Sequence, residues 1–437
     1  MKVGFISLGC SKNLVDTEMT IGLFKEHQYD IVNDTNEAEI IVVNTCGFIE
    51  SAKQEAINTI LEMAEYKTKG SCKYLIAMGC LVERYEKELK KALPEVDLFL
   101  PIKDYDKIWE KIEKLVNKNT HNLQTSNLDY MNRVISTGKT TTYLKIAEGC
   151  SNKCTYCAIP YIRGQYISRP FEEIIEEAKL LAKKGYKEII VIAQDTTKYG
   201  IDLYGKPRLA ELLTKISKIE GIKWIRFLYA YPESITDELI ETVKNNNKIC
   251  KYFDIPIQHI SNSVLKRMNR KSNREQIENL IDKIKRKIPD VILRTSLIVG
   301  FPGEAEKDFE ELYNFVAKSN FDKLGVFKYS REDNTPAARL PEQIHYKTKT
   351  KRLNEIMSLA QKISKQKLTE KIGKEYETLI ETLTFDGKYY VGRTYMDIPE
   401  EDGVVFIPNT KPNLENTWIN VKITDVKNYD LIGEILG

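Results

Sequence analysis

The sequence predicts an α/β protein built from a doubly wound parallel sheet, a partial (β/α)6 barrel and a small antiparallel β-barrel. Short apolar runs alternate with amphipathic helical patterns over residues 1–116, and six further strand–helix units follow over residues 142–366. Residues 367–437 contain only short strand-like runs between turn residues. A length of 437 residues suits three domains, each with its own core.

The composition, with 42% hydrophobic and 30% charged residues, is that of a folded globular protein and argues against disorder. No run of 18 apolar residues exists, which excludes a membrane-spanning helix, so we expect no membrane partner. The apolar run at residues 3–8 is too short for a secretory signal, and we expect a cytoplasmic protein. Eight cysteines are too sparse for a disulfide framework.

In the first domain, apolar runs predict buried strands and amphipathic stretches predict helices. The expected strands are residues 2–8, 39–44, 74–78 and 98–101, and the expected helices are residues 15–24, 51–66, 82–92 and 105–116. Short buried strands that alternate with helices indicate a parallel sheet covered on both faces. The polar, aperiodic segment 117–141 is predicted to be a linker.

The central domain repeats this alternation over a longer stretch. Its expected strands are residues 143–147, 188–193, 224–228, 252–257, 291–299 and 323–327, and its expected helices are residues 170–184, 209–219, 235–245, 273–287 and 305–318. Six units in this space favour a full or partial parallel barrel over a second small open sheet. A basic helix over residues 346–371 leads into the last domain.

The last domain shows a different pattern, in which Gly, Asp and Asn separate short strands. The expected strands are residues 377–381, 389–394, 404–407, 418–426 and 431–436. Several short strands of this kind are typical of a small antiparallel barrel.

Three cysteines, Cys150, Cys154 and Cys157, lie within eight residues, directly after the first strand of the central domain. Active sites of such barrels lie at the C-terminal ends of the strands. A structural zinc ion needs four protein ligands, and the sequence offers no nearby fourth Cys or His. An iron–sulfur cluster on three cysteines keeps one iron open for an external ligand. A zinc site completed from elsewhere and a loop of packed thiols remain as alternatives.

The pattern Cys-x3-Cys-x2-Cys, with Tyr156 just before the last cysteine, resembles the signature of the radical S-adenosylmethionine (SAM) superfamily. The resemblance implies a [4Fe–4S] cluster whose open iron is chelated by the amino and carboxylate groups of SAM. One electron would then cleave SAM to methionine and a 5′-deoxyadenosyl radical. The cofactor carries this chemistry, and the protein supplies geometry and excludes water.

Polar residues and glycines at the other strand ends of the central domain resemble the SAM-binding wall of this superfamily. Polar side chains there suit an amino group or a ribose, and glycines allow the backbone to approach a ligand closely. With Tyr156, the expected cofactor contacts are Gln194, Asp195, Gln258, Arg294, Gly300 and Glu304.

A second set of cysteines, Cys10, Cys46 and Cys80, follows the ends of three expected strands in the first domain. Adjacent parallel strand ends lie about 5 Å apart, so these thiols should converge. A count of three again leaves one iron free, which favours a second cluster over three merely buried thiols. Cys72 and Cys250 do not share this placement, and we expect both to be free thiols.

Together these features resemble the methylthiotransferases over nearly the whole chain. The resemblance implies a flavodoxin-like first domain, a radical SAM core, a TRAM domain of OB-like shape, and two [4Fe–4S] clusters. The auxiliary cluster, on the first cysteine set, would supply or carry sulfur methylated by one SAM. A second SAM would yield the radical that abstracts hydrogen from an unactivated C–H bond. A flavodoxin- or ferredoxin-like protein would donate the electron, and no catalytic residue is predicted beyond the cluster ligands.

Members of this family modify either an adenosine of transfer RNA or an aspartate of small-subunit ribosomal protein twelve, and the charge distribution bears on this choice. Residues 367–437 carry eight positive and thirteen negative side chains, a net charge of −5, whereas the whole chain carries +3. A barrel that grips RNA should be basic, because it must neutralise phosphates. An acidic barrel suits a basic ribosomal protein, although acidity also serves solubility.

Three segments favour the ribosomal-protein branch. Leu8-Gly-Cys10-Ser-Lys-Asn-Leu-Val-Asp16 is similar to that branch, whereas the transfer-RNA branch more often has Gln-Met-Asn after the cysteine. The segments 390–393 and 397–403 are similar to the C-terminal domain of the ribosomal-protein branch. We therefore expect methylthiolation of the aspartate β-carbon. The alternatives are methylthiolation of transfer RNA and a zinc-stabilised, non-catalytic adaptor associated with the ribosome.

Overall fold

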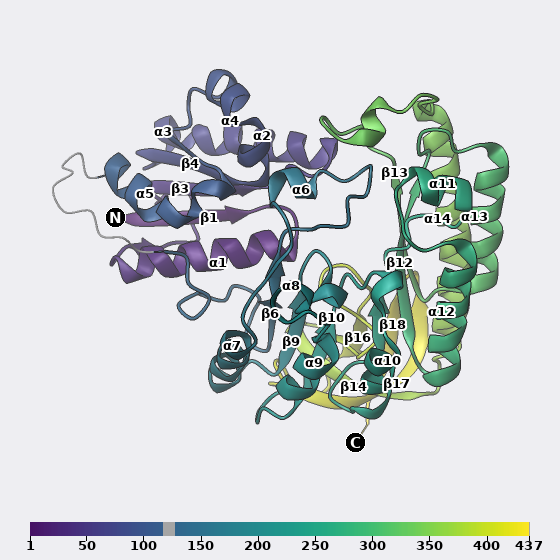
Figure 1. Cartoon of the computed structure of the whole chain (residues 1–437). Helices are drawn as coiled ribbons and strands as arrows, with labels where there is room; N and C mark the ends of the chain where they lie inside the picture. Colours follow the sequence, from purple (N-terminus) through teal and green to yellow (C-terminus); the bar gives the residue numbers. More distant parts are fainter. Residues whose placement is uncertain (117–126, 437) are drawn as a thin grey trace.

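The computed structural model describes residues 1–116 and 127–436 and contains three units in the predicted order. Figure 1 shows the N-terminal unit in purple and blue, the central unit in teal and green, and the C-terminal barrel in yellow. The α/β class and the three architectures are thus confirmed, while the domain boundaries stay predictions. In the described residues, no helix is both long and apolar enough to cross a membrane.

The N-terminal unit is a five-stranded parallel sheet of order β2-β1-β3-β4-β5 with helices on both faces. Along β3, Ile41 and Val43 belong to one apolar cluster, and Ile40 and Val42 belong to the cluster on the other face. This alternation buries β3 completely. The elements are β1 (Lys2–Ser7), α1 (Ser11–Glu26), β2 (Asp30–Ile31), β3 (Ile40–Thr45), α2 (Glu50–Ala64), α3 (Tyr66–Lys69), β4 (Tyr74–Gly79), α4 (Cys80–Ala92), β5 (Leu98–Leu100) and α5 (Ile108–Val116).

The central unit has two three-stranded parallel sheets, β10-β9-β6 and β11-β12-β13, joined by a bridge between Ile225 and Ile249. The elements are β6 (Thr141–Lys145), β7 (Ala147–Glu148), α6 (Ile159–Ile162), β8 (Ile167–Ser168), α7 (Phe171–Lys183), β9 (Glu188–Ile192), α8 (Ile201–Tyr204), α9 (Leu209–Ser217), β10 (Trp224–Phe227), α10 (Asp237–Asn245), β11 (Tyr252–Asp254), α11 (Asn262–Arg267), α12 (Arg274–Lys287), β12 (Ile292–Val299), α13 (Glu306–Ser319), β13 (Lys323–Lys328) and α14 (Tyr346–Thr369). The elements that the sequence missed, such as α6 and β8, are too short to show periodicity.

Of the predicted linker, residues 117–141, the structure describes residues 127–141, and residues 117–126 lie outside the described residues. The described part is held by contacts to both neighbouring units. Arg133 is buried and forms ion pairs with Glu18 of α1 at 2.6 Å and with Glu177 of α7 at 3.0 Å. This part of the segment therefore ties the N-terminal unit to the central unit.

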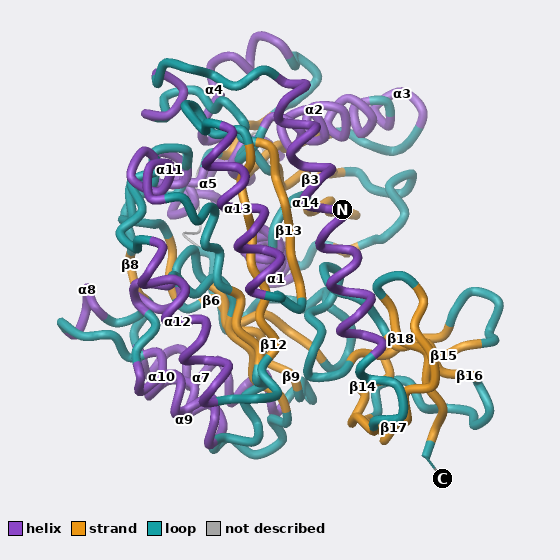
Figure 2. Tube along the Cα trace, turned by 90° about the vertical axis from the view of Figure 1, so that its right-hand side faces the viewer, coloured by secondary structure: helices purple, strands orange, loops and turns teal. Residues whose placement is uncertain are grey.

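The C-terminal unit is a closed barrel of order β14-β15-β16-β18-β17. Its strands are β14 (Glu375–Leu383), β15 (Tyr389–Arg393), β16 (Val405–Pro408), β17 (Trp418–Lys427) and β18 (Asp430–Ile435). Figure 2 shows them gathered beside the end of α14. The predicted antiparallel pairing is wrong at one place, because β16 and β18 pair in parallel to close the barrel.

Candidate functional site

The structure brings the first set of cysteines to one edge of the N-terminal sheet. Cys10 immediately precedes α1, Cys46 follows β3, and Cys80 is the first residue of α4. Strands β1, β3 and β4 are parallel neighbours, with Ser7 opposite Asn44 and Thr45 opposite Gly79. The three thiols therefore lie at equivalent ends of adjacent strands.

Two glycines allow these loops to approach one another. Gly9 has φ +87°, and a Cβ there would lie 2.7 Å from the Cβ of Cys46. Gly79 has φ +96°, and a Cβ there would lie 2.2 Å from Oδ1 of Asn44. Both positions require glycine for the left-handed backbone and for space.

Buried charges surround the first set. Against the effect of burial, Lys12 and Arg163 lower the pKa of the Cys10 thiol. Burial raises the pKa of Cys80 to about 12, with smaller contributions from Cys10 and Cys46. The three thiols lie at neighbouring strand ends, and a set of three thiol donors suits an iron–sulfur cluster.

The second set lies in a loop that several elements hold in place. The backbone N–H of Cys150 donates to the carbonyl of Gly164 at 3.1 Å. Asn152, inside the loop, donates to the buried carboxylate of Asp195 at 2.8 Å. Asn269 donates to the carbonyl of Lys153 at 2.9 Å. Asp195, predicted as a cofactor contact, thus holds the cysteine loop itself.

Arg270 is a residue of this site that the sequence analysis missed. Its Nη1 lies 4.0 Å from Sγ of Cys154, and its Nη2 donates to the carbonyl of Pro256 at 2.9 Å. The pKa of the Cys157 thiol is raised, mainly by burial and to a smaller extent by the neighbouring Cys154. A single arginine between two helices carries no local signal, so only the fold reveals its position.

Two predicted cofactor contacts present unpaired polar atoms. Oη of Tyr156 and Oε1 of Gln194 are buried without a hydrogen-bond partner among the described residues. The ring of Tyr156 packs edge-on against Phe301, and Nε2 of Gln194 donates to Glu148 at 2.7 Å. A buried polar atom normally has a partner, so both atoms fit a bound ligand. Gln258, at φ +70°, pairs through its backbone N–H with the carbonyl of Ser296.

The loop after β12 is fixed by α14. Gly300 has φ +71°, and a Cβ there would lie 2.3 Å from Cγ of Lys349. The carboxylate of Glu304 accepts from Arg352 at 2.8 Å and from the N–H of Phe301 at 3.0 Å. Burial raises the pKa of Glu304 to about 7.

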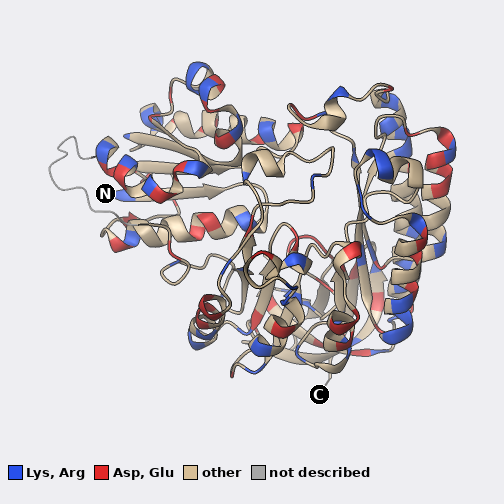
Figure 3. Cartoon of the chain, in the orientation of Figure 1, with Lys and Arg blue, Asp and Glu red and all other residues tan. Residues whose placement is uncertain are grey.

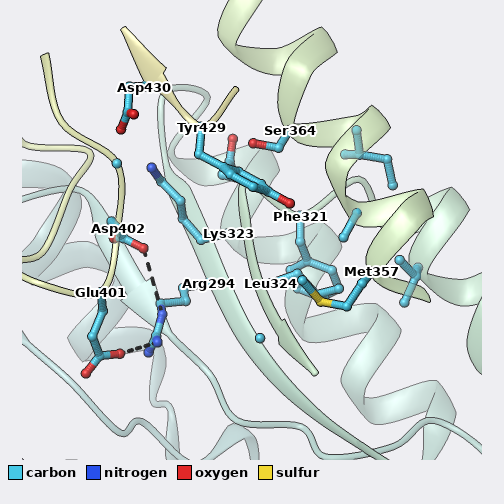
Figure 4. A pocket seen from close by; sticks show the side chains of 16 residues that line it. Arg294, Phe321, Lys323, Leu324, Met357, Ser364, Glu401, Asp402, Tyr429 and Asp430 are labelled. Atoms are coloured by element: carbon cyan, nitrogen blue, oxygen red, sulfur yellow. Dashed lines mark hydrogen bonds and ion pairs between the residues drawn. The ribbon is translucent and has the colours of Figure 1, made fainter. Parts of the chain in front are cut away.

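Arg294 lies at the interface with the C-terminal barrel. It pairs with Asp254 at 3.2 Å and with Glu401. Figure 4 shows Arg294 beside Glu401 and Asp402, at the edge of a cavity of about 460 Å³. Among the described residues, the ion pairs of Arg294 are with acidic side chains, and none is with another predicted cofactor contact.

An ion-pair network joins the two cysteine sites. Asp16 of α1 pairs with Lys145 at 2.5 Å and with Arg163 at 2.9 Å. Both cations also pair with Glu148, each at 2.9 Å. Against the effect of burial, Arg163 and Lys145 lower the pKa of Glu148. The network sets the N-terminal unit against the mouth of the central barrel.

The spacing of the thiols bears on which metal group they could hold. Within the part of the chain that the structure describes, no three His, Cys, Asp or Glu side chains are placed to hold one metal ion. Thiolates on one tetrahedral zinc ion lie less than about 4 Å apart, because each Zn–S bond is about 2.3 Å. A [4Fe–4S] cluster binds each cysteine through a different iron and suits more widely spaced thiols.

The acidity of the C-terminal barrel is partly used within the molecule. Four of its acidic residues contact the central unit: Glu377 with Lys223, Asp397 with Lys323, Glu401 with Arg294 and Asp402 with Tyr252. Figure 3 shows both charge signs interleaved along the helices on the outer side of the central unit. Part of this acidity therefore holds the C-terminal barrel on the central unit, and its role toward a basic partner stays a prediction.

Three family models match the chain: the uncharacterized protein family UPF0004 at residues 2–101, the radical SAM superfamily at residues 144–316 and the TRAM domain at residues 372–436. Curated relatives include proteins named ribosomal protein uS12 methylthiotransferase RimO. The one from Alkaliphilus oremlandii is 64% identical over 436 residues, covering 100% of this chain and 99% of the relative. The one from Acetivibrio thermocellus is 51% identical over 447 residues, covering 100% and 98%.

Two solved structures share the fold. The radical SAM methyltransferase TsrM from Kitasatospora setae, with cobalamin and a [4Fe–4S] cluster bound, has a TM-score of 0.58 at 12% identity and covers 77% of this chain and 76% of its own. The cobalamin-dependent SAM radical enzyme OxsB has a TM-score of 0.51 at 14% identity and covers 82% and 56%. At these identities the likeness concerns the fold alone.

Proposed function

The chain belongs to the ribosomal protein uS12 methylthiotransferase (RimO) family of radical SAM enzymes, and from that premise we propose that it acts on uS12 itself. The reaction would replace a hydrogen on the β-carbon of one aspartate with a methylthio group. The observation that carries the proposal is the identity of 64% over the full length of a protein with that name. A ribosomal substrate also suits the expected cytoplasmic location.

A [4Fe–4S] cluster and SAM are the cofactors that the superfamily implies, and we assign two clusters to this chain. Cys150, Cys154 and Cys157 would hold the one that cleaves SAM. Cys10, Cys46 and Cys80 would hold the auxiliary one. Bound there, the clusters and SAM would supply a hydrogen-abstracting radical and a methylated sulfur. Each thiol set follows strand ends of its own unit, which supports this assignment, and the electron donor is expected to be a flavodoxin- or ferredoxin-like protein.

The protein's own residues would orient SAM and exclude water. We assign ligand contacts to Tyr156 and Gln194, because each has a buried polar atom without a partner. Asp195 would act by fixing the cysteine loop through Asn152. We also keep Gln258 among the proposed contacts to SAM. Gly300 and Glu304 would shape the loop after β12, which would help to hold SAM.

Arg294 receives a different assignment from the one that the sequence predicted. Its guanidinium already pairs with Asp254 and Glu401. A cation held by two carboxylates at a domain interface suits docking of the C-terminal barrel better than SAM binding.

The proposal predicts a mass change in one ribosomal protein. Deleting the gene should lower the mass of uS12 by about 46 Da, the difference between H and SCH3, and leave the methylthio content of transfer RNA unchanged. Mass spectrometry of digested uS12 and of digested transfer RNA measures both. Complementation with wild type or Cys72→Ala should restore the mass, whereas Cys154→Ala should not. Loss of the group from transfer RNA alone would refute the proposed substrate.

A further inference from the structure

The ammonium group of Lys12 is buried beside the first cysteine set without a carboxylate partner. Lys12, Lys53 and Lys145 are the lysines buried in the described residues, and Lys12 is 7% exposed. Lys53 and Lys145 each form ion pairs with two carboxylates. In the same described ranges, no carboxylate oxygen lies within ion-pairing distance of Lys12. Buried charges are normally paired, so the Cys10 thiolate and an anion bound beside it are the groups that could balance this cation.

A strained tyrosine from the central unit lies against this lysine. Nζ of Lys12 is 3.4 Å from the centroid of the Tyr229 ring. Tyr229 has φ +60°, a costly conformation for an aromatic residue. Its backbone N–H donates to Asp254 at 2.9 Å, and its carbonyl accepts from the N–H of Thr196. The ring stabilises the cation but supplies no negative charge.

The position of Lys12 indicates which anion would bind. It lies in the first turn of α1, two residues after Cys10. Tyr229 follows β10 at the C-terminal end of a barrel strand. Lys12 therefore lies between the first cysteine set and the barrel mouth, where substrate must meet both sites.

We propose that Lys12 binds the side-chain carboxylate of the target aspartate, an inference that rests on the proposed function. The carboxylate carbon is bonded directly to the β-carbon that gains the methylthio group. A carboxylate held on Lys12 thus places the reacting carbon beside the first cysteine set, and it gives the buried ammonium group a carboxylate partner. Lys12 would determine specificity for aspartate over its uncharged amide.

The test compares the binding of two forms of purified uS12, one with the target aspartate and one with asparagine in its place. The holoenzyme is used under anaerobic conditions. Wild type should bind the aspartate form more tightly by a factor on the order of 10 to 100, as expected for a charged hydrogen bond. Lys12→Met should bind both forms with the affinity that wild type has for the asparagine form. Lys12→Arg should keep most of the preference, and Lys25→Met, an exposed change on the same helix, should keep all of it.

The iron and sulfide content and the visible spectrum separate this role from a structural one. Lys12→Met should match wild type in both measurements. The inference would be overturned, and the proposed function left standing, by any of three results for Lys12→Met: it keeps the preference for the aspartate form, it binds both forms more weakly by the same factor, or it loses iron. A wild-type enzyme that modifies transfer RNA and not uS12 would overturn the proposed function as well.

Discussion

Asn13 connects the loops that carry the first set of cysteines. Its Nδ2 donates to the carbonyls of Leu8 and Thr45, both at 3.0 Å. Its Oδ1 accepts from the thiol of Cys80 at 3.4 Å and from Arg163. Because the side chain is fully buried, no water can replace these bonds. One amide thus holds the ends of β1 and β3 and the start of α4 together.

We predict that Asn13→Ala destabilises the protein and weakens the first site. Removing the amide leaves buried carbonyls unpaired, which should cost about 2–4 kcal/mol of unfolding free energy. Iron per chain after anaerobic reconstitution should fall toward half, because only the first cysteine set is affected. Urea unfolding and iron analysis measure the two effects. Asn58→Ala, on the exposed face of α2, is the control. Full iron together with an unchanged urea midpoint in Asn13→Ala would contradict this role.

At the scale of elements, each cysteine loop depends on a backbone conformation at a strand end. Gly9 leaves β1 in the left-handed region and packs directly on Cys46. The sequence showed glycine beside each of these cysteines, but only the paired strands reveal the close approach.

We predict that Gly9→Ala is far more harmful than a comparable change elsewhere. Gly185 has φ +98°, and a Cβ there would meet nothing within 4 Å. Gly185→Ala should therefore show only the left-handed penalty of about 1–2 kcal/mol. Gly9→Ala adds a collision with Cys46, so it should lower both the urea midpoint and the iron content. Equal stability and equal iron in the two variants would show that the close approach does not matter.

At the scale of the whole molecule, the three units share buried contacts. One apolar cluster contains Val15 of α1, Tyr143 of the central sheet and Leu379 of the C-terminal barrel. Glu188 of β9 pairs with Arg226 at 2.6 Å and with Arg393 of β15 at 2.7 Å, all fully buried. The C-terminal barrel is therefore docked on the central unit through paired charges.

The ion pairs of Glu188 with Arg226 and Arg393 predict how the stability of the protein depends on pH. Against the effect of burial, Arg393 and Arg226 lower the pKa of Glu188 to about 2. Its ordinary pKa is 4.5, so its stabilisation is complete above that pH and is lost as pH falls toward 2. Urea unfolding should show about 3 kcal/mol lost across this window. Glu188→Gln should be less stable by about 3–5 kcal/mol at pH 7, with a flatter acid limb. Exposed Glu375→Gln should behave as wild type, and an unaltered acid limb in Glu188→Gln would refute the assignment.

The sequence by itself determined the order of the three units and the two sets of three cysteines at strand ends. Strand–helix alternation and cysteine spacing are local properties, so the chain displays them before it folds. The observed ends of individual strands differ from the predicted ends by a few residues, because hydrogen bonding to neighbouring strands decides where a strand ends.

Only the tertiary structure decided what Arg294, Lys12 and the acidic C-terminal residues contact. Arg393 meets Glu188 across 205 positions, and Arg294 meets Glu401 across 107. No local pattern encodes such a pair, because its geometry depends on how separately folded units pack. The sequence attributed the acidity of the last unit to a partner, whereas packing shows that part of it holds the molecule together.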